Sequence, residues 1–199
     1  MTNLVFFLEE KSAEALLKGL VPRLLHGIDM DSETNVYYFY FHGNGDLEKN
    51  LAMKIRRWEK PNSRFVVLRD QDVADCKSVK EKLINIARNS GDSGRPVLVR
   101  VVCRCLESWV LGDLKALAKA YGDSKIENLE CKEKYRDPER LHQPDEEIKQ
   151  IIPRYEKVEG ARLVGPLLDI ENNNSKSFRV FCRGVRDLVG KQKATSASQ

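Results

Sequence analysis

The sequence predicts an α/β fold in which a sheet of about four parallel strands is flanked by helices and followed by a helical C-terminal extension. Short apolar or aromatic runs, which are typical of buried strands, recur up to residue 102. A segment with helical spacing of apolar residues separates each run from the next. Strands that alternate with helices in this way form parallel sheets with right-handed crossovers. After residue 107 the strand-like runs give way to helical segments and one long polar stretch.

The predicted strands are bounded by turn residues and are rich in β-branched or aromatic side chains. They are Leu4–Leu8, Asn35–His42, Phe65–Leu68 and Val97–Val102.

Three helices are predicted between these strands, each from a start signal and an apolar stripe. Ser12 is expected to cap the first, which Pro22 should kink or interrupt before Leu25. The second follows a glycine-rich turn at 43–46 and includes Trp58 in its buried stripe, and Ser78 is expected to cap the third.

The region after the fourth strand has less apolar periodicity. Helices are predicted around 114–118, 146–152 and 178–188, and residues 123–145 are predicted to be a long loop with short turns. We therefore expect a core over residues 1–112, an extension over residues 113–190 packed on it, and a solvated, disordered tail over residues 191–199.

Composition excludes several classes of protein. The chain has 199 residues, enough for one compact domain, and five irregularly spaced cysteines with no CxxC pair, which argues against a disulfide scaffold or a structural zinc site. The odd cysteine count predicts reduced thiols and a cytoplasmic location. The N-terminal apolar run is too short for a signal sequence or a membrane span. A net charge of +4 permits nucleic-acid binding without requiring it.

Acidic residues follow three of the predicted strands. Glu9 follows the first, Asp70 and Asp72 follow the third, and Glu107 lies a few residues after the fourth. In open α/β sheets ligands bind at the carboxyl edge, and carboxylates gathered there repel one another unless a hard cation such as Mg2+ lies between them. If the chain stays extended, period-2 spacing puts Asp70 and Asp72 on the same side. The alternative is that these acids are solvated residues or helix caps.

The order of these acids resembles the Toprim domain of topoisomerases, primases and overcoming-lysogenization-defect nucleases. In that domain a Glu after the first strand and an Asp-x-Asp after a later one bind Mg2+, and Glu9 with Asp70 and Asp72 match these positions. Glu10 stands where Toprim domains usually carry glycine.

Nearly the whole chain resembles an uncharacterised bacterial family of Toprim-related small proteins, which are often encoded beside an AAA-type ATPase. The resemblance is carried by several short motifs, including Glu9–Glu14, Gly43–Leu47, Arg69–Asp72, Leu106–Trp109 and Asn174–Phe178. Cys105 departs from the pattern, because an acid is expected two residues before Glu107.

The resemblance implies an Mg2+- or Mn2+-dependent nuclease that acts as the effector partner of an AAA-type ATPase in anti-phage defence. Glu9, Asp70, Asp72 and Glu107 would bind the metal, with Glu9 also catalytic. Lys157 would stabilise charge on the phosphoryl group. The residues expected to contact DNA or RNA are Lys54, Arg57, Arg136 and Lys157. The alternative is a non-catalytic metal-binding or adaptor subunit of an ATPase complex.

Overall fold

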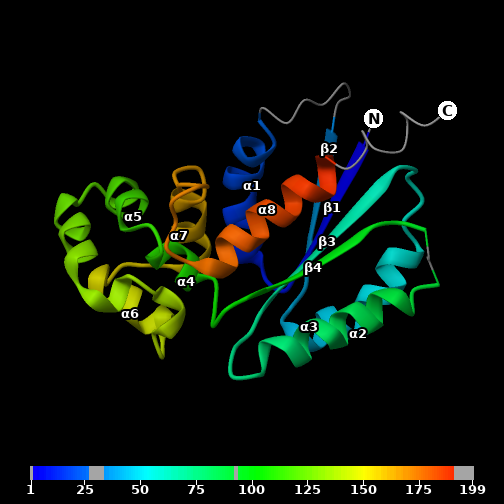
Figure 1. Ribbon diagram of the computed structural model, residues 1–199, viewed down its shortest axis with the longest axis horizontal. Helices are drawn as coiled ribbons and strands as arrows, with labels where there is room; N and C mark the ends of the chain where they lie inside the picture. The colour runs from blue at the N-terminus through cyan, green and yellow to red at the C-terminus, as the bar shows by residue number, and fades with distance from the viewer. Residues whose placement is uncertain (1, 27–33, 92–93, 191–199) are drawn as a thin grey trace.

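The computed structural model describes residues 2–26, 34–91 and 94–190 (Figure 1). The predicted tail, residues 191–199, lies outside the described residues. The strands are β1 (Thr2–Leu8), β2 (Thr34–Tyr40), β3 (Ser63–Asp70) and β4 (Val97–Val102). The α-helices are α1 (Lys11–Leu25), α2 (Asn44–Arg56), α3 (Cys76–Arg88), α4 (Glu107–Leu111), α5 (Leu114–Tyr121), α6 (Pro144–Ile151), α7 (Lys157–Val164) and α8 (Lys176–Gly190). Three 3₁₀ helices are η1 (Ser124–Cys131), η2 (Glu133–Tyr135) and η3 (Pro138–Arg140).

Within these residues the strands form one parallel sheet in the order β2-β1-β3-β4. Alternate side chains of each strand enter two separate apolar clusters, because successive side chains point to opposite faces. On β1, Phe6 packs in the cluster beneath α1 and α8, whereas Phe7 packs in the cluster beneath α2 and α3. Figure 1 shows these two pairs of helices on opposite sides of the sheet. The predicted sheet with flanking helices is therefore confirmed.

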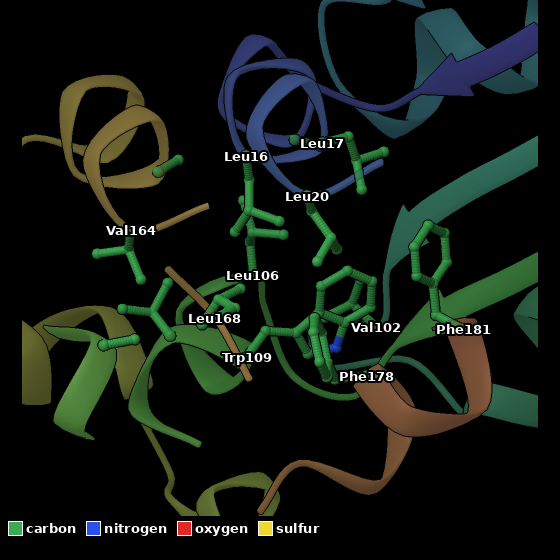
Figure 2. Packing of buried hydrophobic residues seen from close by; sticks show 14 of the residues in the cluster. Leu16, Leu17, Leu20, Val102, Leu106, Trp109, Val164, Leu168, Phe178 and Phe181 are labelled. Atoms are coloured by element: carbon green, nitrogen blue, oxygen red, sulfur yellow. The ribbon is translucent and has the colours of Figure 1, made fainter. Parts of the chain in front are cut away.

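The C-terminal half of the chain packs on the same face of the sheet as α1. Trp109 on α4 lies between Phe178 and Phe181 on α8, with ring centroids 5.3 and 5.0 Å away (Figure 2). Val164 on α7 and Leu16 on α1 belong to the same apolar cluster. The position of α4, which carries Glu107, is thus set by a core that spans both halves of the chain.

Helices α1 and α7 approach closely because glycines lie at their contact. A Cβ on Gly19 would lie 2.5 Å from the Pro166 ring, and a Cβ on Gly165 would collide with the backbone carbonyl of Leu16. The absence of these side chains lets the backbone of α7 rest against α1. This close approach matters for function because two residues of the candidate site lie at the starts of these helices: Glu10 directly precedes α1, and Lys157 is the first residue of α7.

We expect Gly165→Ala to reduce the free energy of unfolding by about 1–3 kcal/mol, because its methyl group meets backbone that cannot rotate away. Chemical denaturation measures the change. Gly45→Ala is the control, because open space surrounds a Cβ there and we expect no loss. Equal stability of the two variants would contradict the close α1–α7 contact.

Several local predictions were wrong. Helix α1 begins at Lys11 with Glu10 at the N-cap, so Ser12 lies inside the first turn. Pro22 does not interrupt this helix, which continues to Leu25. Asp75 caps α3, and its carboxylate accepts the Ser78 N–H at 2.8 Å. Capping depends on backbone geometry at the strand–helix junction, which the sequence pattern does not specify.

Two further elements differ from expectation. Helix α2 ends at Arg56, so Trp58 lies beyond it, where its indole packs edge-on against Tyr37 and Phe39. Helix α7 was not predicted at all, and the predicted loop over residues 123–145 contains the three 3₁₀ helices. None of the helices within the described residues combines the length and apolarity needed to span a membrane.

Candidate metal centre

Two adjacent glutamates follow β1 and point to different neighbours. The Glu9 N–H still pairs with the Leu68 carbonyl at 3.2 Å, which extends the strand by one residue. The Glu9 carboxylate accepts the Asp70 N–H at 2.9 Å and lies 3.9 Å from the Arg69 Nε. Glu10, by contrast, contacts Lys157 of α7. This division follows the alternation of side chains along an extended chain.

At the end of β3, the side chains of residues 69 and 70 also contact different parts of the structure. The buried Arg69 donates to Glu48 of α2, which also binds Lys82 of α3 at 2.6 Å. Asp70 is buried, and its Oδ2 accepts the Leu106 N–H at 3.2 Å. Arg69 therefore anchors Glu9 to the α2–α3 layer, whereas Asp70 belongs to the α4 side of the sheet edge.

A turn after β4 brings Glu107 to the same place. Arg104 adopts a φ of 66°, in the left-handed region, and its carbonyl accepts the Asp72 N–H at 2.9 Å. The turn carries Leu106 over Asp70 and starts α4 at Glu107. Glu107 is fully buried, and neither of its carboxylate oxygens meets a donor at hydrogen-bond geometry, although Lys157 and the adjacent Cys105 thiol both lower its pKa.

Lys157 completes the cluster from α7. Its Nζ lies 3.2 and 3.4 Å from the two carboxylate oxygens of Glu10. Burial works against its charged form, but the negative charges of Glu107 and Glu10 outweigh burial and raise the pKa of Lys157. The lysine therefore stays charged and faces the buried acids.

The buried carboxyls resist ionisation. Burial, and then the charges of Glu10 and Glu107, raise the pKa of Asp70 well above its usual value. Burial also raises the pKa of Glu107, against the opposing effect of Lys157. The pKa of Glu9 is raised by burial and lowered in part by the Asp70 N–H. Without a cation, the ionised forms of Asp70 and Glu107 are thus disfavoured by burial, and Lys157 offsets only part of that cost.

These features fit a hard divalent cation. Buried polar groups are normally hydrogen-bonded, so two partnerless carboxylate oxygens require an explanation, and an ion is one. The donors are all carboxylate oxygens, the ligands that Mg2+ and Mn2+ prefer. Within residues 2–26, 34–91 and 94–190, however, no three acidic, histidine or cysteine side chains lie in an arrangement that already matches a metal site. Binding would therefore require side-chain rotations around Asp70 and Glu107.

The comparisons with known proteins agree with this architecture. Residues 8–186 match the family described as Domain of unknown function (DUF4276). The chain belongs to the DUF4276 family. None of the curated proteins searched matches it.

The DUF4276 chain is similar in structure to the C-terminal region of the Burkholderia pseudomallei OLD protein. The TM-score is 0.55 at 16% sequence identity, over 94% of this chain and 98% of that one. At this identity the likeness shows the fold alone. Together with the observed sheet, it confirms the predicted Toprim-like fold with a helical C-terminal extension.

The predicted metal ligands all lie at the carboxyl edge of the DUF4276 sheet, but within the described residues they are not arranged as ligands around a single point. Asp70 and Glu107 are near neighbours, and Glu9 is joined to them through the Asp70 backbone. Asp72 is exposed, because β3 ends at Asp70 and Asp72 adopts a φ of 55°, but its charge still adds to the effect of burial in raising the pKa of Glu9. The extended geometry that would align the two aspartates does not persist.

The other predicted nucleic-acid contacts lie elsewhere. The last turn of α2 contacts the segment that precedes β4, since Arg56 Nε donates to the Ser90 carbonyl at 2.9 Å. Arg57 directly follows this turn, and the Lys54 Nζ lies over the Phe39 ring of β2, 5.8 Å from its centroid. Arg136 is exposed at the end of η2. Among the side chains predicted to contact nucleic acid, Lys157 is the one that contacts an acid of the cluster, Glu10.

Three residues of the centre were not predicted to function there. Glu10 stands where the sequence resemblance led us to expect a glycine, and the signal that could have identified it is that it directly follows Glu9. Arg69 could not be recognised, because a charged residue beside a strand end is usually solvated. Cys105 interacts with the acids: burial, then the charges of Glu107 and Asp70, raise the pKa of its thiol. It therefore remains a neutral thiol in a position where an acid was expected.

Proposed function

We propose that this DUF4276 chain is an Mg2+- or Mn2+-dependent nuclease-like protein that cleaves phosphodiester bonds in DNA or RNA. The observation that carries the proposal is the fully buried Glu107 carboxylate, which has no hydrogen-bond partner and lies beside the buried Asp70. Such a pair is costly to bury without a cation. Its place at the carboxyl edge of a parallel sheet is where ligands bind in open α/β folds.

Asp70 and Glu107 would hold the cation, with Glu10 and Glu9 as further oxygen donors and Asp72 at the exposed rim. A cation bound there would polarise a phosphate oxygen and lower the pKa of an attacking water. Lys157, half-exposed and charged, would bind the phosphate and stabilise charge that develops on it. Glu9, whose pKa burial raises, is suited to accept and return a proton at the reacting oxygen.

In this proposal residues 1–112 form the catalytic core, and residues 113–190 form an extension that contributes Lys157. A cytoplasmic setting is consistent with the free thiols of the five cysteines. We also propose that an AAA-type ATPase is the partner, with a role in anti-phage defence, as the sequence resemblance implies.

Asp70→Asn is the direct test. The amide keeps an oxygen to accept the Leu106 N–H but removes the charge. We expect Mn2+ binding, measured by isothermal titration calorimetry, and metal-dependent cleavage of plasmid, single-stranded DNA and RNA to fall at least about 100-fold, as for loss of a group central to catalysis.

Glu130→Gln is the matched control. Glu130 is exposed and contacts Lys115 at 3.5 Å, away from the cluster, so its charge should not affect either measurement. Cleavage by Asp70→Asn at the wild-type rate would refute the proposed centre.

A second candidate is a non-catalytic metal-binding or adaptor subunit of an ATPase complex. The neutral thiol of Cys105, in place of an acid, favours it, because one hard oxygen ligand is missing beside Glu107 and Asp70. Mn2+ binding that Asp70→Asn abolishes, without cleavage by the wild type either alone or with a co-expressed ATPase, would support this candidate over the enzyme.

A further inference from the structure

A pocket of about 410 Å3 adjoins the candidate metal centre. Glu10 and Lys157 belong to both, so a ligand in the pocket would lie next to the acids. The remaining wall comes from the start of α1, the end of β2, the turn into α2 and the second residue of α7. Its lining residues are Lys11, Ser12, Tyr40, Phe41, His42, Gly43 and Val158. Its volume lies within the range of small-molecule sites in proteins.

The pocket wall is fixed to the strand that carries Glu9. The Phe41 N–H donates to the Leu8 carbonyl at 2.9 Å, and the Gly43 N–H donates to the Glu9 carbonyl at 3.1 Å. Gly43 adopts a φ of 93°, which glycine tolerates and other residues rarely adopt, so the chain can turn here without leaving the sheet edge. The pocket therefore keeps a defined position relative to Glu9.

The pocket combines exposed apolar surface with positive charge. Tyr40 is 41% exposed and Val158 is 38% exposed, although most large apolar residues in the described part of the chain are buried. The Tyr40 and His42 rings lie edge to face, with centroids 5.9 Å apart. Lys11 is exposed and lines the same pocket, as does Lys157, which also contacts Glu10 of the acidic cluster.

An aromatic ring beside cations is the chemistry that binds a nucleobase and its phosphate. Bases of single-stranded nucleic acids stack on aromatic side chains while lysines follow the backbone. A base inside a duplex is already stacked on its neighbours and would have to be extruded first.

We propose that this pocket binds the unpaired nucleotide next to the scissile phosphate, with its base stacked on Tyr40 and its phosphate near Lys11 and Lys157. The substrate is then single-stranded nucleic acid or a frayed end. This inference rests on the proposed nuclease function and specifies its substrate class.

The test is fluorescence anisotropy with labelled single-stranded DNA, single-stranded RNA and blunt duplex DNA of the same sequence. Ca2+ replaces Mg2+, since it takes the same oxygen ligands, and the oligonucleotides are checked afterwards for cleavage. We expect Tyr40→Ala to weaken single-strand binding about tenfold, the usual effect of losing one base–aromatic stack. Duplex binding should not change. Comparing single-stranded DNA with single-stranded RNA establishes whether binding depends on the sugar of the nucleotide.

Two variants separate stacking from damage to the fold. Tyr40→Phe retains the ring and should bind like the wild type. Met53→Ala removes a side chain that is 38% exposed on α2, outside the pocket, and should have no effect. Thermal unfolding of each variant checks that β2 remains in place.

The outcomes distinguish this inference from the proposed function. If the wild type cleaves nucleic acid but Tyr40→Ala binds single strands normally, the pocket assignment is wrong and the nuclease function stands. Equal weakening of single-strand and duplex binding by Tyr40→Ala would also overturn the assignment. If the wild type neither binds nor cleaves any probe, both proposals fail.

Discussion

Glu107→Gln is expected to make the metal-free protein more stable than the wild type, by about 1–3 kcal/mol, while it abolishes the response to Mn2+. The gain comes from removing a buried negative charge, because a carboxylate costs more to bury without a partner than a neutral amide does. Glu107 carries this cost because it is fully buried and both carboxylate oxygens lack a hydrogen-bond partner. The amide removes the negative charge beside Asp70 and keeps the side-chain shape.

The gain in stability that we expect from Glu107→Gln should depend on pH. Burial raises the folded-state pKa of Glu107 above its ordinary value of 4.5, so the folded protein binds its proton more tightly than the unfolded chain does. Ionised Glu107 therefore destabilises the fold above its folded-state pKa, and this penalty is lost as pH falls towards 4.5. The advantage of Glu107→Gln should accordingly be largest near neutral pH and should shrink in acid.

Urea denaturation at several pH values, with EDTA or with Mn2+, measures both effects. A cation that binds only the folded state stabilises it by about 2.7 kcal/mol at 100 times its Kd, and we expect this gain in the wild type alone. Glu130→Gln serves again as the control and should behave like the wild type. If Glu107→Gln were less stable than the wild type in EDTA, the carboxylate would be a structural group rather than a metal ligand.

Trp109→Ala should cost about 3–5 kcal/mol, the largest stability loss that we expect from a single substitution here. Trp109 is fully buried between Phe178 and Phe181, and its indole N–H donates to the Ser177 Oγ at 2.8 Å. The substitution would leave a cavity between α4 and α8. Because Glu107 precedes Trp109 on α4, the metal response should weaken as well.

Thermal and urea unfolding measure the loss. Trp109→Phe fills most of the space and loses only the hydrogen bond to Ser177, so about 1 kcal/mol is expected. If Trp109→Ala were no less stable than Trp109→Phe, the α4–α8 contact would not hold the extension on the sheet.

The strands and their carboxyl-edge acids were predictable because they depend on local patterns. A buried strand needs a short apolar run, and four such runs separated by helical segments define a parallel sheet. The positions of Glu9 and Asp70 followed, since each stands at the end of such a run.

Helix α7 could not be predicted from local sequence patterns. Its eight residues include Gly160, and its position depends on a glycine contact with α1 that is distant in the chain. Short helices are stable mainly through tertiary packing rather than through their own propensity.

The sequence by itself determined the alternation of strands and helices and the edge of the sheet where the acids gather, because side-chain period and chain direction are local properties. Only the tertiary structure decided that Glu10 and Lys157 join Asp70 and Glu107, that Asp72 is exposed beyond the end of β3, and that the last turn of α2, next to Arg57, packs against the segment before β4. Burial and charge pairing arise between segments far apart in the chain. They are set by how helices pack on the sheet, which no short stretch of residues encodes.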